Sequence, residues 1–316
     1  MNGDGFDDLL TISPGTYDPY GYDRGEAYVV FGKAAGTAVP SFDLNDLNGV
    51  NGFRITDRGF ISAAGDVNAD GFSDFLVGGN LIFGKADWSG SPSVDPASLD
   101  GINGIRFYAP GPVSSAGDVN GDGFDDFIVG APFAGYYGGG ESYVVFGKAD
   151  WSDNPTPDVT SPDGTNGFKL AGTEGYSGLS VSSAGDVNGD GFDDLIVLAP
   201  FAYNERYELG QSYVVFGKSN WTETPALDLG SLDGTNGFRL SPIDVRYSAG
   251  HLVSNAGDFN GDGFDDLIIG APYGAGDSGE SYVVFGKQSW AGTPSLDLAA
   301  LDGEDYDHGC FIAPTV

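Results

Sequence analysis

Short apolar runs separated by clusters of glycine, proline, asparagine and aspartate recur along the whole chain. The pattern is clearest in a stretch with four such runs, at residues 181–184, 195–198, 212–216 and 237–240. Runs of this length between turn-forming residues predict β-strands. The second and third runs are apolar at consecutive positions, as expected when both faces of a sheet are covered. We therefore predict four-stranded antiparallel units whose two faces pack against neighbours.

One ten-residue phrase introduces these units. G-D-V-N-G-D-G-F-D-D occurs at residues 117–126 and 185–194, and at 257–266 with phenylalanine for valine; variants lie at 65–74 and 1–8. An apolar run, a glycine-rich loop, a second run, a polar linker and a final strand follow each copy. Tandem repeats of one unit indicate a stacked architecture. The sequence thus predicts an all-β fold, a β-propeller of four-stranded antiparallel blades, either a closed ring of five blades or part of a larger, for example seven-bladed, propeller.

Five repeats divide the chain, and we treat residues 1–316 as a single domain. The first repeat begins within the phrase, with Met1 where Val119 and Val187 stand, so it lacks its first strand and its leading aspartate. We expect that the segment after Ile312 supplies the missing strand or that further blades lie outside this chain, and a signal peptide could then lie upstream. The repeats span residues 1–57, 58–109, 110–173, 174–243 and 244–316.

The composition agrees with a folded β protein. The 316 residues include 53 glycines and 17 prolines, which disfavour long helices, and 40% are hydrophobic, which is enough for a sizeable core. The single cysteine, Cys310, excludes an internal disulfide. No stretch of 18 apolar residues exists, so we expect no membrane span.

The charge is strongly acidic, with 46 Asp and Glu against 13 Lys and Arg and a formal net charge of −33. Such a field repels phosphates, so we expect no nucleic acid partner. Self-repulsion of this size also disfavours a compact state unless a cation is bound within it. The charge balance therefore favours a bound divalent metal.

The repeated phrase contains D-x-N-x-D-G-x-x-D, a pattern of oxygen donors. Side chains at positions 1, 3, 5 and 9 and the backbone carbonyl at position 7 can converge on a hard cation, and glycine at position 6 permits the sharp turn. Carboxylates and an amide favour Ca²⁺ over metals that prefer thiolate or imidazole. An EF-hand is excluded because position 12 holds an apolar residue such as Val129 and not Glu. Plain Asx turns are the alternative for one copy, but four complete copies favour metal binding.

We predict one Ca²⁺ in each blade hairpin, at four complete sites and one truncated site that has the weakest affinity. The truncated site, which lacks position 1, consists of Asn2, Asp4, Phe6 and Asp8. The complete sites, each with a phenylalanine carbonyl at position 7, are Asp66, Asn68, Asp70, Phe72 and Asp74; Asp118, Asn120, Asp122, Phe124 and Asp126; Asp186, Asn188, Asp190, Phe192 and Asp194; and Asp258, Asn260, Asp262, Phe264 and Asp266.

The apolar run after the loop ends in Gly130-Ala-Pro132 and Gly270-Ala-Pro272, with Leu198-Ala-Pro200 as a near match. Loop and ending together resemble the FG-GAP repeats of the integrin alpha-subunit N-terminal β-propeller and its bacterial relatives, over essentially the whole chain. The resemblance implies calcium in the hairpin between strands 1 and 2, an extracellular setting and a role in adhesion. Integrin propellers have seven blades and pair with a beta subunit, whereas five repeats occur here. Repeat 2 also lacks the Gly-Ala-Pro loop, so a bacterial-type relative is favoured over an integrin.

Antiparallel strands place the loops between strands 2 and 3 at the opposite end of a blade from the calcium hairpins. These loops are rich in tyrosine and arginine, which favour protein or sugar contacts when exposed. They resemble by position the loops of the integrin binding face, so we predict a protein or glycan ligand here; tyrosines packed on one another are the alternative. The ligand-face candidates are Tyr17, Tyr20, Tyr22, Arg24, Tyr136, Tyr137, Tyr203, Arg206, Tyr207 and Tyr273.

In four repeats a tryptophan follows the lysine at the end of strand 3 by three residues. Repetition at one blade position favours anchors for the linker between strands 3 and 4 over sugar-binding platforms. Asp87-x-Ser89-x-Ser91 matches metal-dependent adhesion sites, but these belong to an α/β domain, and we interpret the match as coincidence. The tryptophans are Trp88, Trp151, Trp221 and Trp290.

Catalysis has little support in the sequence. The two histidines are His251 and His308, no G-x-S-x-G motif is present, and nearly all paired carboxylates belong to the acidic loops. We therefore predict a non-enzymatic, calcium-binding β-propeller that is extracellular or at the cell surface and acts as a binding or cell-adhesion module. The alternative is a non-catalytic propeller attached to a hydrolase or lyase that acts on polysaccharide or glycolipid.

Overall fold

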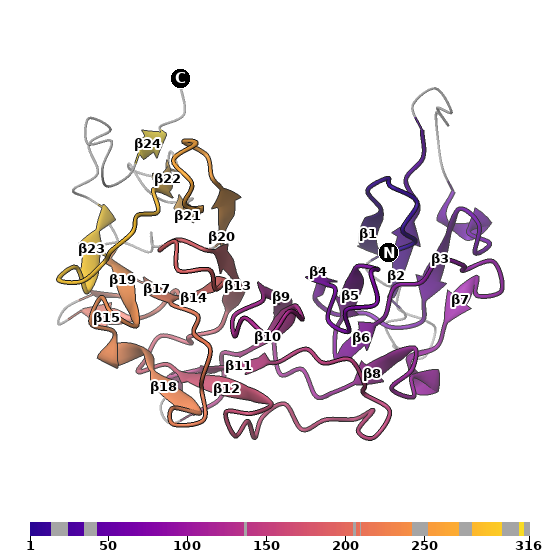
Figure 1. The fold of residues 1–316 in the computed structure, drawn as a ribbon, viewed down its shortest axis with the longest axis horizontal. Helices are drawn as coiled ribbons and strands as arrows, with labels where there is room; N and C mark the ends of the chain where they lie inside the picture. Colours follow the sequence, from indigo (N-terminus) through magenta and orange to yellow (C-terminus); the bar gives the residue numbers. More distant parts are fainter. Residues whose placement is uncertain are drawn as a thin grey trace. The chain divides into compact units, whose positions relative to one another are not determined.

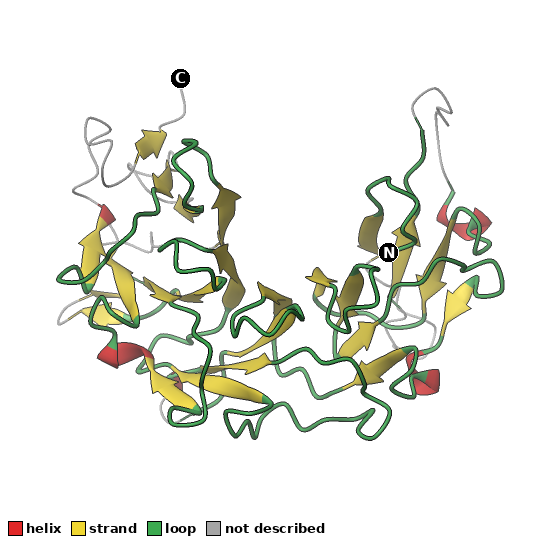
Figure 2. Ribbon diagram, viewed as in Figure 1, coloured by secondary structure: helices red, strands yellow, loops and turns green. Residues whose placement is uncertain are grey.

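The regular structure of the chain is almost entirely β-strand (Figure 2). The helical segments in the described ranges are short 3-10 turns such as η1 (Leu44–Asp46), η2 (Pro96–Ser98) and η4 (Leu229–Ser231). The all-β prediction is therefore confirmed. The computed structural model describes residues 1–13, 25–34, 43–135, 138–204, 207–208, 210–241, 252–271, 280–298 and 310–312.

The chain forms two compact units, which Figure 1 draws in sequence colours. The first consists of Met1–Tyr108 and Gly147–Asp158, and the second of Ala109–Phe146 and Val159–Val316. The larger sheets within each unit are numbered here as blades 1 to 5, after the repeat that supplies most of their strands. The grouping of all repeats into a single domain stays a prediction.

The first unit contains blades 1 and 2, with strand orders β1-β2-β3-β7 and β4-β5-β6-β8. Neighbouring strands are antiparallel except for the pair β3 and β7. The bounds are β1 (Leu9–Ser13), β2 (Glu26–Val30), β3 (Gly52–Ile55), β4 (Ile61–Gly65), β5 (Asp74–Val77), β6 (Asn80–Ile82), β7 (Ser93–Val94) and β8 (Gly104–Arg106).

The second unit contains blades 3, 4 and 5 and one short hairpin, β15–β16. The blade orders are β9-β10-β11-β12-β18, β13-β14-β17-β19-β23 and β20-β21-β22-β24. The bounds are β9 (Val113–Gly117), β10 (Asp126–Ala131), β11 (Glu141–Val145), β12 (Gly167–Ala171), β13 (Ser180–Gly185), β14 (Asp194–Ala199), β15 (Tyr203–Asn204), β16 (Tyr207–Glu208), β17 (Gln211–Val215), β18 (Ala226–Asp228), β19 (Gly237–Ser241), β20 (Leu252–Gly257), β21 (Asp266–Ala271), β22 (Glu280–Val284), β23 (Ser295–Asp297) and β24 (Cys310–Ile312).

The strands confirm the predicted four-stranded antiparallel unit. In blade 4, β13, β14, β17 and β19 match the four predicted runs to within one residue at each end. Blade 1 receives β1, β2 and β3 from its own repeat, and these correspond to strands 2, 3 and 4 of the other repeats. Within the described residues, the first repeat therefore lacks its first strand, as predicted.

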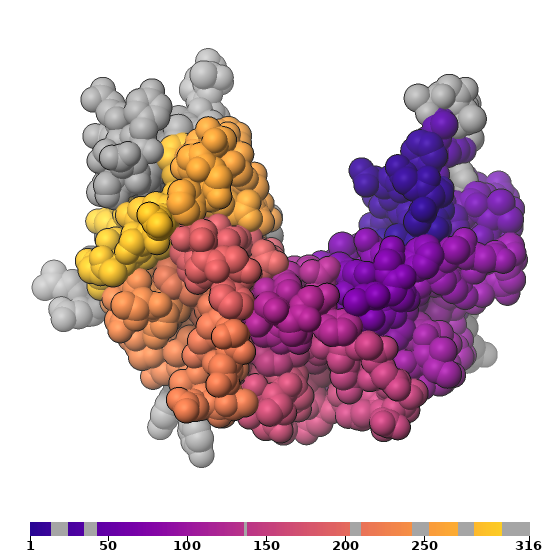
Figure 3. Space-filling model, viewed as in Figure 1, coloured from indigo at the N-terminus to yellow at the C-terminus, as the bar shows by residue number. Residues whose placement is uncertain are grey.

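Within each unit, neighbouring blades share hydrophobic cores, and this explains the consecutive apolar positions. Along β14 every residue is buried. Val197 packs into the core shared with blade 3, whereas Ile196 packs into the core shared with blade 5. Both faces of the strand are thus buried between neighbours, and the atoms of successive repeats in the second unit pack side by side (Figure 3).

The polar linkers between strands 3 and 4 form additional parallel strands, which the sequence pattern did not reveal. Each such strand joins the outer edge of the preceding blade: β7 pairs with β3, β18 with β12 and β23 with β19. The Pro225 carbonyl accepts a hydrogen bond from the Lys169 amide at 2.8 Å, for example. In repeat 3 the equivalent of Leu227 is Pro157, which lacks the N–H that a strand residue donates. There, the Pro155 carbonyl still accepts from the Arg106 amide at 2.9 Å.

The four tryptophans fix these linkers on the preceding blade. Their side chains are at most 4% exposed. Trp221 stacks on Phe168 with ring centroids 3.4 Å apart, and the Lys218 ammonium lies over the Trp221 ring, 4.3 Å from its centroid. Trp88 and Trp290 stack in the same way on phenylalanines of blades 1 and 4. Their prediction as linker anchors, and not as exposed sugar platforms, is confirmed.

Candidate metal centre

In blades 2 to 5 the acidic loop joins the first and second strands and begins at a distortion of the strand pairing. The register of β13 and β14 shifts between Ser183 and Gly185, and Gly185 has a φ of +70°. Similar shifts occur at the loops of blades 2, 3 and 5. A positive φ is accessible to glycine without strain, so this residue turns the chain out of the strand and into the loop.

The first aspartate closes the loop on itself. Asp186 Oδ1 accepts hydrogen bonds from the amides of Gly189 at 2.7 Å and Asp190 at 3.0 Å, and its Oδ2 accepts from the Gly191 amide at 2.9 Å. Asp118 accepts three equivalent bonds in blade 3. One carboxylate therefore holds both of its oxygens on the inner side of the loop, toward the backbone amides.

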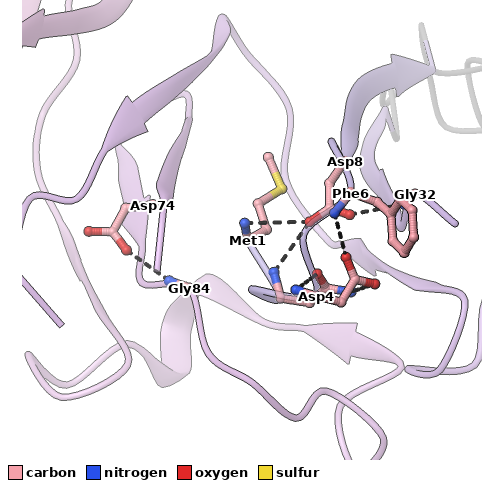
Figure 4. Close-up of polar contacts among 8 residues, drawn as sticks. Met1, Asp4, Phe6, Asp8, Gly32, Asp74 and Gly84 are labelled. Carbon is pink, nitrogen blue, oxygen red and sulfur yellow. Dashed lines mark hydrogen bonds and ion pairs between the residues drawn. The ribbon is translucent and has the colours of Figure 1, made fainter. Parts of the chain in front are cut away.

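The third and fifth residues extend this arrangement. Asn188 Oδ1 accepts from the Asp190 amide at 2.9 Å, and Asp190 Oδ1 accepts from the Phe192 amide at 3.1 Å. The side-chain Nδ2 of Asn188 donates to Asp190 Oδ2 at 3.0 Å. The same three contacts join Asn2, Asp4 and Phe6 in the truncated loop (Figure 4). The structure thus brings the first, third and fifth residues of each complete loop into one hydrogen-bonded turn.

The ninth residue is turned into the blade. Asp194 is fully buried; its Oδ2 accepts from the Val187 amide at 3.0 Å and its Oδ1 from the Gly217 amide at 2.9 Å. Asp74 makes the same two contacts with Val67 and Gly84, the latter shown in Figure 4. The carboxylate therefore ties its loop to the Phe-Gly-Lys segment after strand 3, which is residues 216–218 in blade 4 and 83–85 in blade 2. We did not predict this role.

Burial also changes the acidity of these ninth residues. Loss of solvation raises the pKa of Asp74 to about 7, against the lowering effect of its two backbone hydrogen bonds. Burial raises the pKa of Asp194 and Asp266 in the same direction. A buried carboxylate without a nearby cation is therefore a costly anion in these loops.

The donor chemistry of the loops fits a hard divalent cation, because every side chain in the predicted sets that offers a ligand atom offers oxygen. A carboxylate has about four lone-pair sites, so bonds to backbone amides leave acceptor capacity for an ion. Across the described ranges, however, no three Asp, Glu, His or Cys side chains gather closely enough to hold a metal. Calcium coordination by the predicted residues stays a prediction.

Most ligand-face candidates lie outside the described residues: Tyr17, Tyr20, Tyr22, Arg24, Tyr136, Tyr137, Arg206 and Tyr273. His251 and His308 also lie outside them. Tyr203 and Tyr207 lie in the hairpin β15–β16 that joins the second and third strands of blade 4. Their role in ligand binding stays a prediction.

At this end of blades 3 and 4 the structure shows an exposed aromatic cluster that we did not predict. Phe133, Tyr176 and Phe201 are 77%, 39% and 37% exposed. The Tyr176 ring lies edge-on to both phenylalanines, with centroid distances of 5.6 and 5.8 Å. One feature of the sequence could have revealed this cluster: both phenylalanines directly follow the Ala-Pro pair at the end of strand 2.

No helix in the described part of the chain combines the length and apolar character needed to cross a bilayer. Comparison with known proteins then relates the repeats to a family. The FG-GAP repeat model matches residues 110–145, 177–215 and 249–284, which include the acidic loops of blades 3, 4 and 5.

Several integrin alpha chains are similar in sequence. Integrin alpha pat-2 of Caenorhabditis elegans is 31% identical over 210 residues, which cover 62% of this chain and 15% of that protein. Integrin alpha-7 of Rattus norvegicus is 33% identical over 181 residues, 56% of this chain and 13% of the relative. Integrin alpha-V of Gallus gallus is 27% identical over 223 residues, 67% and 20% of the two chains. The chain thus spans a fifth or less of these curated relatives.

Proposed function

Because this chain is an FG-GAP repeat protein with integrin alpha-like β-propeller blades, we propose that it is a calcium-binding module that binds a protein or glycan ligand in cell adhesion. The observation that carries the calcium proposal is the recurrence of one loop geometry. In each of four loops the first aspartate accepts hydrogen bonds from the backbone amides of the fifth and sixth residues. The third and fifth side chains each accept a hydrogen bond from the backbone amide two residues further along.

The charge of the loops supports the same proposal. Each complete loop holds three carboxylates at positions 1, 5 and 9. Four Phe-Gly-Lys segments contact the acidic loops through their backbones, and their lysine ammonium groups lie over tryptophan rings, 4.3–4.5 Å from the centroids. A divalent cation in the loop would offset the repulsion among the carboxylates and favour their ionised forms.

Calcium affinity bears on the location. Extracellular calcium modules bind with dissociation constants of roughly 10⁻⁴ to 10⁻³ M, far above the calcium concentration of the cytosol. This chain is similar to integrin alpha chains, a resemblance that supports an extracellular setting. We therefore place the module outside the cell or at its surface.

The ligand is proposed to bind at the ends of the blades that lie opposite the acidic loops. Phe133 and Phe201 lie just after the C-terminal ends of β10 and β14, whereas the acidic loops directly precede the N-terminal ends of these strands. Exposed aromatic side chains in contact with one another are a common feature of protein recognition surfaces. The activity proposed is binding and not catalysis; attachment to a polysaccharide- or glycolipid-acting enzyme stays the alternative.

A thermal melt tests the calcium proposal. We expect the melting temperature to be higher with calcium than with chelator. When the calcium concentration is ten times the dissociation constant of a site, binding at that site adds about 1.4 kcal/mol to the free energy of unfolding. The double variant Asp122→Ala plus Asp190→Ala should lose much of that rise. Asp153→Ala, which removes an exposed charge outside the loops, is the matched control and should respond to calcium like the unaltered chain. Equal melting temperatures with calcium and with chelator for the unaltered chain would reject the proposal.

A further inference from the structure

Acidic loops of consecutive repeats are stacked on one another in the second unit. The Phe192 ring of blade 4 covers Gly121 in the loop of blade 3, so closely that a Cβ atom on Gly121 would lie 2.5 Å from Phe192 Cε1. Phe264 of blade 5 covers Gly189 in the loop of blade 4 with the same separation of 2.5 Å. The seventh residue of one loop therefore covers the fourth residue of the preceding loop.

The eighth residue makes a polar contact across the same junction. Asp193 Oδ2 accepts from the Asp118 amide at 2.8 Å, and the Asp193 amide donates to the Asp118 carbonyl at 3.2 Å. Asp265 binds Asp186 in the same way, at 3.0 and 3.2 Å. Asp118 and Asp186 are the first residues of their loops. The following repeat thus binds both the backbone N–H and the backbone carbonyl of each.

The Phe-Gly-Lys segment contacts both loops at once. The Lys218 amide donates to the Val119 carbonyl of the preceding loop at 3.0 Å, whereas the Gly217 amide donates to Asp194 Oδ1 at 2.9 Å. A Cβ atom on Gly217 would lie 2.4 Å from the Asp193 carbonyl oxygen and 2.8 Å from that of Val119. Only glycine fits between the two loops at this position, and Gly286 occupies the same place at the next junction.

From these contacts we infer that Asp193 and Asp265 are positioning residues for the cation ligands Asp118 and Asp186 of the preceding repeat, and that neighbouring loops bind calcium cooperatively. The inference rests on the calcium binding proposed above. An ion that orders one loop also fixes the segments that hold its neighbour, so the neighbour loses less conformational freedom when it binds its own ion.

The acidic loop of blade 5 differs from those of blades 3 and 4 in how well its second residue is covered. Val119 and Val187, at the second position of their loops, are completely buried by the following repeat. Phe259, at the same position in the loop of blade 5, is 62% exposed, and no described segment covers it. The inference therefore predicts weaker calcium binding by residues 258–266 than by residues 186–194.

Hydrogen exchange followed by mass spectrometry during a calcium titration tests the inference one loop at a time. In Asp193→Ala we expect the calcium concentration for half-maximal protection of residues 118–126 to rise about tenfold, which corresponds to the loss of about 1.4 kcal/mol. Residues 258–266 should titrate as in the unaltered chain. Asp193→Asn retains an oxygen that can accept the Asp118 amide, so it should restore most of the affinity.

The outcomes separate this inference from the calcium proposal. If the unaltered chain shows no calcium-dependent protection in any loop, the calcium proposal fails. If its loops are protected but residues 118–126 titrate alike in the unaltered chain and in Asp193→Ala, the positioning role is overturned while calcium binding stands. Should Asp193→Ala fail to fold, Asp265→Ala makes the same test at the next junction, because Asp265 contacts Asp186 as Asp193 contacts Asp118. Residues 186–194 should then show the rise, and an unchanged titration of these residues overturns the role.

Discussion

At the scale of single residues, the ninth loop position shows one carboxylate serving two segments. The buried Asp194 carboxylate accepts one hydrogen bond from a backbone amide of its own loop and one from a backbone amide of the segment after strand 3. Asp190, at position 5, is exposed and bonds only within its loop in the contacts described above. The two aspartates are equivalent as predicted ligands, but the structure gives them unequal roles in folding.

Substitution of these two residues by asparagine should separate the roles. With chelator present, we expect Asp194→Asn to lower the free energy of unfolding by about 1–3 kcal/mol, because its amide N–H groups would face a backbone N–H donor in a buried place. Asp190→Asn makes the same chemical change at an exposed position and should cost less than about 0.5 kcal/mol. Urea unfolding measures both, and equal losses would contradict the structural role of Asp194.

At the scale of elements, the linkers bind each blade to the next repeat. β18, from repeat 4, lies parallel to β12, with Leu227 opposite Leu170. Pro157 stands at the equivalent position of repeat 3, where the structure retains the Pro155 carbonyl contact with Arg106. The linker strand is therefore stabilised by backbone hydrogen bonds and by apolar packing. A proline in this strand removes one backbone N–H donor.

Leu227→Pro should reproduce this difference in blade 3. We expect the free energy of unfolding to fall by about 1–3 kcal/mol, since a strand amide is lost and a partly buried leucine is removed. Leu227→Val keeps the amide and should cost less than about 1.5 kcal/mol. Denaturant unfolding of the two variants decides the matter: a proline variant as stable as the valine variant would show that the strand hydrogen bonds contribute little.

At the scale of the whole molecule, the charge of −33 opposes compactness. Part of this charge lies in the acidic loops, at the first, fifth and ninth positions of each complete loop and also at the eighth position in repeats 3, 4 and 5. Stability should therefore depend on ions in two ways, through specific binding of calcium and through general screening by salt.

A salt series with and without calcium should distinguish the two effects. In chelator we expect the melting temperature to rise as sodium chloride increases, because the Debye length falls from about 30 Å at 0.01 M to about 3 Å at 1 M. With saturating calcium the rise should be smaller, since bound ions have already offset part of the repulsion. Calorimetry at constant pH measures both series; parallel curves would show that calcium does not neutralise the charge that salt screens.

The strands and the acidic turns could be predicted from the sequence alone, because both depend on local properties. Consecutive apolar residues such as Ile196 and Val197 already indicate a strand covered on both faces, and the spacing of Asp186, Asn188 and Asp190 already indicates a turn closed by side-chain oxygens. The contacts between repeats, in contrast, became known only from the folded structure. Asp193 binds Asp118 across 75 positions of sequence, and the linker strand joins a blade other than its own. Such partners are selected by packing of distant segments, on which local periodicity carries no information.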